Sequence, residues 1–222
     1  MAKVTLQAAI KKVKKTGYDL RDLDETFRDN EEVVLAAIEN DMYAFGFASD
    51  RLKDDEKFFL KALKVRRGDV IQFASERIRN DKKCATKAVK SSWTSYNLIG
   101  DDLKADRELL ELALDSNSNI FSNDTPLETC AAIFKSDKEI VKKAIKNWAF
   151  ALRCASDELR GDRELVMIAV SDIGGALEYA SDNLKNDKEI VLKAVSLDPD
   201  ALEFASEKMK KDKDVLRVIQ VS

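Results

Sequence analysis

Histidine is absent from this chain of 222 residues. Catalytic Ser-His-Asp and Cys-His groups, HExxH sites and His-Cys zinc sites all need histidine, so the sequence excludes them. Glycine occurs only 7 times and proline 2 times, which argues against a sheet-rich fold. No apolar run approaches the length of a membrane span, and the opening MAKVTLQAAIKKVKK lacks the apolar core of a signal peptide. We therefore expect a cytoplasmic protein with no membrane span.

The chain repeats itself with a period of about 25 residues, within the range that is typical of stacked repeat proteins. Residues 177–195 read LEYASDNLKNDKEIVLKAV, residues 152–170 read LRCASDELRGDRELVMIAV, and residues 202–216 read LEFASEKMKKDKDVL. One acidic or amide residue marks every copy, at Asn30, Asp55, Asp81, Asp106, Asp137, Asp162, Asp187 and Asp212. A period of this size predicts stacked helical units, each burying its apolar face against the next.

Each copy is predicted to hold two short helices. In residues 177–186, apolar side chains recur at the i, i+3 and i+7 spacing of a helix, and a second helix follows from Asp187. Asp187 is suited to accept hydrogen bonds from the first turn of that helix, so we interpret the recurring Asp as an N-cap and not as a catalytic group. The predicted fold is all-α: a right-handed α/α solenoid of about eight 25-residue two-helix repeats, forming one domain over residues 1–222.

Two irregular features have simple structural interpretations. Cys84, Cys130 and Cys154 stand in slots that are apolar in other copies, so we expect buried free thiols in a reducing compartment. The segment 115–126, DSNSNIFSNDTP, contains a six-residue insertion that serves as a surface loop, a hinge between two half-stacks, or part of a binding face.

Charge is unevenly distributed along the chain. The net formal charge is −3, yet residues 51–100 hold 13 Lys and Arg against 6 Asp and Glu. Neighbouring repeats place like slots side by side, so this segment is suited to form a positive face that attracts a protein, a nucleic acid or an anionic surface. The simpler interpretation is a solvated face balanced by acidic neighbours. The basic residues that we select as partner contacts are Lys57, Lys61, Arg66, Arg67, Arg79, Lys82, Lys83, Lys87 and Lys90.

Trp93 and Trp148 lie near the ends of second helices, outside the regular apolar stripe. Either they anchor a partner at the surface, or they fill the seam between repeats. The seam is the simpler interpretation. Trp93 lies beside the basic stretch and is therefore the better candidate for a partner contact.

The repeat 177–195 and its copies resemble the short helical repeat catalogued as domain of unknown function 4116. By repeat spacing the resemblance covers nearly the whole chain, most fully at 177–195, 152–170 and 202–216. It implies a helical array with an interaction role, found in protists and in proteins of intracellular bacteria, some of them effector-like and delivered into a host cell. It transfers no catalytic residues, cofactor or metal.

Three functions stay open on this sequence. The first is a non-enzymatic scaffold, expected to be monomeric, that binds a protein partner through an extended surface. The second is nucleic-acid or anionic-surface binding through the basic face of residues 57–90; reading one base per repeat needs a basic or aromatic residue recurring at one slot, and we find none. The third is a carboxylate-dependent enzyme with the insertion as a lid, which needs two carboxylates converging in a deep pocket.

Overall fold

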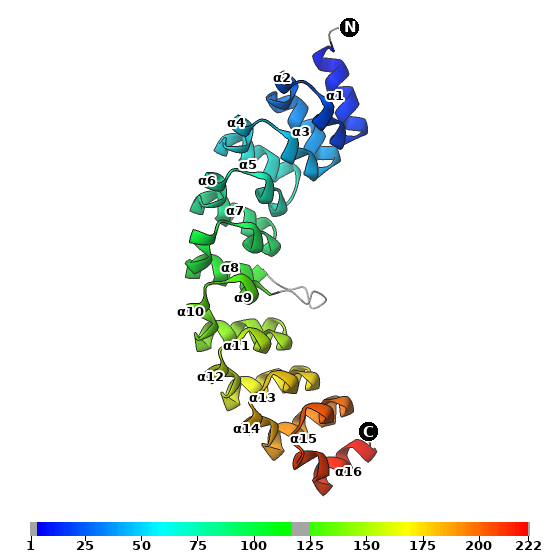
Figure 1. The fold of residues 1–222 in the computed structure, drawn as a ribbon, viewed down its shortest axis with the longest axis vertical. Coiled ribbons are helices and arrows are strands. Elements are labelled where there is room, and N and C mark those ends of the chain that lie inside the picture. Colours follow the sequence, from blue (N-terminus) through cyan, green and yellow to red (C-terminus); the bar gives the residue numbers. More distant parts are fainter. Residues whose placement is uncertain (1–3, 117–124, 222) are drawn as a thin grey trace. The chain divides into compact units, whose positions relative to one another are not determined.

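The computed structural model describes residues 4–116 and 125–221, and all regular secondary structure in these ranges is helical (Figure 1). The chain divides into two compact units, Met1–Ser116 and Asn117–Ser222. Their boundary falls in the insertion 115–126, most of which, residues 117–124, lies outside the described residues. The single-domain, hinge and loop interpretations therefore stay predictions. In the two described ranges, no helix combines the length and hydrophobicity that crossing a membrane requires.

Long helices form one row in each unit. In the first unit they pack one against the next (Figure 1), and they are α1 (Leu6–Lys15), α3 (Glu31–Asn40), α5 (Glu56–Val65), α7 (Lys82–Ser91) and α8 (Arg107–Ser116). In the second unit they are α11 (Lys138–Asn147), α13 (Arg163–Asp172), α15 (Lys188–Leu197) and α16 (Lys213–Val221).

The prediction of a single first helix in each pair is wrong in detail. The structure has two shorter helices in its place. Residues 177–186 contain the end of a 3₁₀-helix, η7 (Gly174–Tyr179), and a four-residue α-helix, α14 (Asp182–Lys185). Between them the backbone is extended at Ala180 (φ −68°, ψ 156°) and at Ser181 (φ −64°, ψ 157°). Serine favours such an extended N-cap conformation over a helix interior.

The same three-part unit recurs along the chain. The other 3₁₀-helices are η1 (Gly17–Asp22), η2 (Met42–Phe47), η3 (Gly68–Phe73), η4 (Trp93–Leu98), η5 (Asp101–Ala105), η6 (Ala149–Cys154), η8 (Pro199–Phe204) and η9 (Met209–Lys211). The other four-residue helices are α2 (Glu25–Arg28), α4 (Asp50–Lys53), α6 (Glu76–Arg79), α9 (Pro126–Thr129), α10 (Ala132–Lys135) and α12 (Asp157–Arg160).

The break between the two short helices serves the contact between repeats. The backbone N–H of Ser181 donates to the carbonyl of Arg160 in the preceding repeat, at 2.9 Å. The same bond recurs as Ser49 to Arg28, Ser75 to Lys53, Gly100 to Arg79, Ser156 to Lys135 and Ser206 to Lys185. Each bond satisfies a carbonyl at the end of a four-residue helix, so the interruption connects each repeat to its neighbour.

The N-cap interpretation of the recurring Asp is confirmed. The Asp187 carboxylate accepts from the backbone N–H of Glu189 at 3.0 Å and of Ile190 at 3.2 Å. The equivalent side chains of Asn30, Asp55, Asp81, Asp106, Asp137, Asp162 and Asp212 also accept from the first turn of the long helix that follows. These residues therefore have a structural role in every copy.

The N-cap Asp also receives a cation from the preceding repeat. The Arg163 Nε lies 3.2 Å from Asp187 Oδ2, and the Lys138 Nζ lies 2.7 Å from Asp162 Oδ2. In each case the cation is the first residue of the preceding long helix. The sequence Asp-Lys/Arg-Glu thus encodes a charge contact between neighbouring repeats.

Replacing Asp187 by asparagine should make stability less dependent on pH. Burial opposes ionisation of Asp187, but the Ile190 N–H and the Arg163 guanidinium outweigh it and hold the pKa of this carboxyl below its usual range. The ionised form therefore stabilises the fold fully above the unfolded pKa of about 3.9, and this contribution is lost as the pH falls through the lower folded pKa. Urea unfolding should show a deficit of up to about 1 kcal/mol for the variant at neutral pH, shrinking in acid.

The exposed Asp182, in the same repeat, provides the control for that experiment. An Asp182→Asn variant should unfold like the wild type at both pH values. A deficit of Asp187→Asn that is the same at neutral and acidic pH would contradict the charge contact.

The core lies between the long helices and the shorter ones. On α15 it includes a stripe of Ile190, Val191, Ala194 and Val195, all fully buried. Cys84 and Cys130 are also buried, as predicted, and burial raises the pKa of the Cys84 thiol to about 12. Cys154 is only half-buried, so the prediction of a fully buried thiol is wrong there: it is the last residue of η6 and lies beyond the buried Ala149, Ala151 and Leu152.

Two adjacent glycines in η7 are predicted to respond differently to alanine. A methyl group at Gly174 would overlap the carbonyl oxygen of Ala194 and lie 2.8 Å from Asp198 Cβ, whereas at Gly175 its nearest neighbour would be Asp198 Oδ2 at 3.5 Å. Gly174→Ala should therefore lower the free energy of unfolding by about 1–3 kcal/mol, because η7 must move away from α15. Gly175→Ala should be neutral or stabilising by up to about 1 kcal/mol. Urea unfolding of both variants checks the order, and a larger loss at Gly175 would contradict it.

Candidate functional site

Six lysines form a regular array on two neighbouring helices of the first unit. On α5 they are Lys57, Lys61 and Lys64, and on α7 they are Lys83, Lys87 and Lys90. Each set follows the i, i+4, i+7 spacing that places side chains on one helix face. Both sets occupy the second, sixth and ninth positions of their helix, so the two helices present the same pattern. All six side chains are exposed, and we call this array the lysine grid.

The lysine grid is compact. Seven residues of α-helix span roughly 10 Å, and packed helices lie about 8–10 Å apart. Since α5 packs on α7, six ammonium groups are carried by an area of roughly 10 Å by 10 Å. This area can attract a small or narrow group of negative charges.

Lysine at the second helical position is a departure from the repeat. That position is acidic in the six other long helices that follow the recurring Asp or Asn: Glu32, Glu108, Glu139, Glu164, Glu189 and Asp214. An acid is favoured there because the N-terminus of a helix carries a partial positive charge. Lys57 and Lys83 oppose that preference. Local choices that oppose the fold's own preferences are expected at functional positions.

Two lysines of the grid are partly neutralised. Lys61 Nζ lies 2.5 Å from Glu31 Oε2, and Lys83 Nζ lies 2.5 Å from Glu56 Oε1. The contact with Glu56 raises the pKa of Lys83. Within the part of the chain that the structure describes, Lys57, Lys64, Lys87 and Lys90 make no ion pair. Acidic neighbours therefore balance the charge at two grid positions. The other four lysines carry positive charges that no neighbouring acid in the described residues pairs with.

Acidic residues border the grid on both sides. The second and ninth positions are Glu32 and Glu39 on α3, which packs on α5. They are Glu108 and Asp115 on α8, which packs on α7. The grid is therefore bounded on the α3 side by acids that are unpaired in the described residues, whereas on the α8 side Glu108 is paired with Lys82.

The other basic residues selected from the sequence do not join the grid. Lys82 contacts Asp106 at 2.8 Å and Glu108 at 2.7 Å, and the Asp106 contact above all raises the pKa of Lys82 to about 12. Arg66 donates to the carbonyls of Ile38 and Asn40, at 3.0 and 2.8 Å, and so closes the C-terminus of α3. Arg67 is exposed ahead of η3.

Arg79 is half-buried at the end of α6, in the row of short helices. It belongs to a recurring pattern that the sequence alone already contains. In every copy a basic residue stands two positions before the N-cap Asp or Asn: Arg28, Lys53, Arg79, Lys104, Lys135, Arg160, Lys185 and Lys210. Our finding of no recurring basic slot was therefore wrong. An acid stands three residues earlier in all copies but the fifth, and Arg160 contacts Asp157 at 2.8 Å. Most of these recurring basic residues therefore have an acidic residue nearby in the sequence.

Both tryptophans are buried. Trp93 begins η4 with 9% of its surface exposed, and Trp148, 6% exposed, lies under the Arg153 guanidinium at 4.7 Å from the ring centroid. Trp93 therefore offers little surface to a partner, and we leave it out of the grid.

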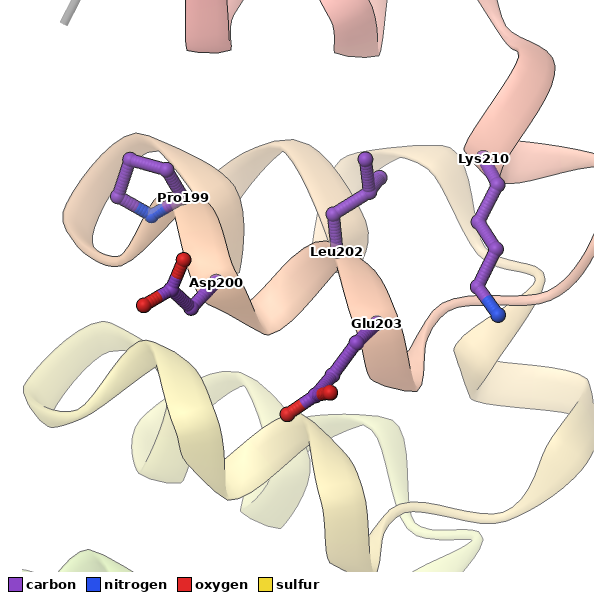
Figure 2. A pocket seen from close by; sticks show the side chains of 5 residues that line it. All are labelled: Pro199, Asp200, Leu202, Glu203 and Lys210. Atoms are coloured by element: carbon purple, nitrogen blue, oxygen red, sulfur yellow. The ribbon is translucent and has the colours of Figure 1, made fainter.

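A hollow in the second unit is lined by Pro199, Asp200, Leu202, Glu203 and Lys210 (Figure 2). Asp200 and Glu203 are three residues apart on η8, so a 3₁₀-helix places both carboxylates on one side. Both side chains are exposed, and the Lys210 ammonium contacts Glu207 at 3.0 Å. The hollow thus holds solvated carboxylates. In residues 4–116 and 125–221, no cluster of three or more Cys, Asp or Glu side chains is arranged to hold a metal ion.

One family matches the chain. The model described as domain of unknown function (DUF4116) matches residues 8–53, 55–104, 133–160, 162–210 and 187–217. These segments together cover most of the chain and follow the repeats of the structure. No curated protein and no solved structure gave a significant match.

Proposed function

The chain belongs to the DUF4116 family, and from this premise we propose that it is a non-enzymatic helical-repeat scaffold that binds a protein partner through an extended surface. Its architecture in this proposal is a right-handed α/α solenoid of about eight repeats. The repeated family matches, the bonds between neighbouring repeats and the exposed outer faces of the long helices support it.

The observation that carries the proposal is the lysine grid. Repeat proteins bind through surfaces that adjacent repeats build together, and α5 and α7 build one from the same three positions. The proposal gives no catalytic role to the Asp200–Glu203 hollow, because exposed carboxylates lack the low-polarity surroundings that tune them for acid–base chemistry.

Nucleic-acid or anionic-surface binding through the basic face of residues 57–90 is the second candidate. The four lysines without an ion pair favour it, since each can neutralise one phosphate. The acidic border on α3 opposes it, because a duplex or a membrane extends beyond two helices and meets Glu32 and Glu39.

Affinity capture from a lysate of the source cells, eluted in steps of increasing salt, tests the proposed function. A discrete protein that elutes as salt rises is the expected result. Recovery of nucleic acid with a steep salt dependence would favour the second candidate. Recovery of neither would contradict binding through the charged surface.

A further inference from the structure

We propose that the lysine grid binds a short acidic peptide segment of the partner, laid across α5 and α7. This inference rests on the proposed scaffold function and names the chemistry of its contact. It commits to carboxylates presented by a polypeptide, and nucleic acids and anionic membranes become competing outcomes of the test.

The size of the grid fits a short peptide. A segment of three or four extended residues spans roughly 10 Å, as do two turns of helix. Either form brings two to four carboxylates over the grid, which matches the four lysines without an ion pair. A longer anion that crosses the row toward α3 meets Glu32 and Glu39.

The kind of cation also favours carboxylates on a flexible segment. Every member of the grid is lysine, and none is arginine. Arginine supplies the fixed pair of donors that recognises phosphate in two-point geometry, whereas lysine acts as a mobile point charge. Such a surface selects for charge density and spacing.

Aromatic platforms are missing from the grid positions. Proteins that bind single-stranded nucleic acids stack bases on exposed aromatic side chains. The exposed aromatics in the described part of the first unit, Tyr18 and Tyr43, lie on the 3₁₀-helices η1 and η2, not on α5 or α7. The grid therefore offers charge without stacking, which suits an acidic peptide.

The test is the binding of a fluorescein-labelled, glutamate-rich peptide to the full chain, followed by fluorescence anisotropy. The grid variant carries Lys64→Gln, Lys87→Gln and Lys90→Gln, three exposed positions that make no ion pair in the described part of the chain. Its matched control carries Lys146→Gln, Lys193→Gln and Lys213→Gln, three exposed lysines on the long helices α11, α15 and α16. Both variants change the net charge equally, so a general charge effect cancels.

We expect the grid variant to bind the peptide about tenfold more weakly than the wild type, and the control to stay within about twofold, because three exposed charge contacts are lost in one case only. The difference should shrink at high salt. Equal losses in both variants would overturn the inference. Tighter binding of a single-stranded oligonucleotide or of phosphatidylserine vesicles than of the peptide, lost in the grid variant, would also overturn it.

The failure of this inference can be told from a failure of the proposed function. If the grid variant captures the same lysate protein as the wild type, the scaffold function stands and the grid is not its contact. If the wild type captures no protein, the scaffold function itself fails.

Discussion

Ala180→Asp should lower the free energy of unfolding by about 3–5 kcal/mol, one of the two largest effects that we expect. Ala180 is 5% exposed and follows η7, where its N–H donates to the carbonyl of Leu177. A carboxylate in that position loses its water without gaining a cation, so the substitution buries an uncompensated charge. Urea unfolding followed by circular dichroism measures the loss, and an unchanged midpoint would disprove the packing of this repeat.

The same substitution at an exposed alanine provides the control. Ala132 begins α10 and is exposed, and it stands where other copies carry Asp157 or Asp182. Ala132→Asp places an acid at a helix N-terminus, three residues before Lys135. We expect it to be neutral or slightly stabilising. Comparable losses at both alanines would show that aspartate is harmful for a reason other than burial.

Phe58→Ala should destabilise the first unit by about 3–5 kcal/mol. Phe58 is fully buried on α5, and its ring lies 5.7 Å from that of Phe45 on η2. The substitution loses the free energy gained by burying a large apolar side chain. It also leaves a cavity that the neighbouring helices fill only in part. Equilibrium unfolding in urea gives the magnitude, and the grid lysines on the same helix report the loss as weaker peptide binding under destabilising conditions.

Tyr43→Ala serves as the comparison, since Tyr43 is 55% exposed and its ring contacts Phe73 edge-on at 5.6 Å. We expect a loss of about 1 kcal/mol or less. If Phe58→Ala cost no more than this, the assignment of α5 to the core would be wrong.

The grid shows how far sequence reasoning could reach toward a site. The lysine excess of residues 51–100 was visible at once, and Lys57, Lys61, Lys83, Lys87 and Lys90 were selected from it. Lys64 was left out, although the repeat spacing already placed it in the same slot as Lys90. Linear sequence does not show that Asp106 lies within reach of Lys82, or that the carbonyls of α3 lie within reach of Arg66. The role of these two residues as partner contacts stays a prediction.

The sequence by itself determined the repeat, the helical class, the N-cap Asp and most of the buried stripe. These follow from local physics: a helix of period 3.6 needs apolar residues at set spacings, and its free N–H groups need an acceptor nearby in the chain. Only the tertiary structure decided that each first helix divides in two, as at the Ala180-Ser181 pair, that Trp93 is buried, and which lysines keep their charge unpaired. Those outcomes depend on groups in the neighbouring repeat, such as the carbonyl of Arg160 that receives the Ser181 N–H. Such partners meet only when one repeat packs on the next.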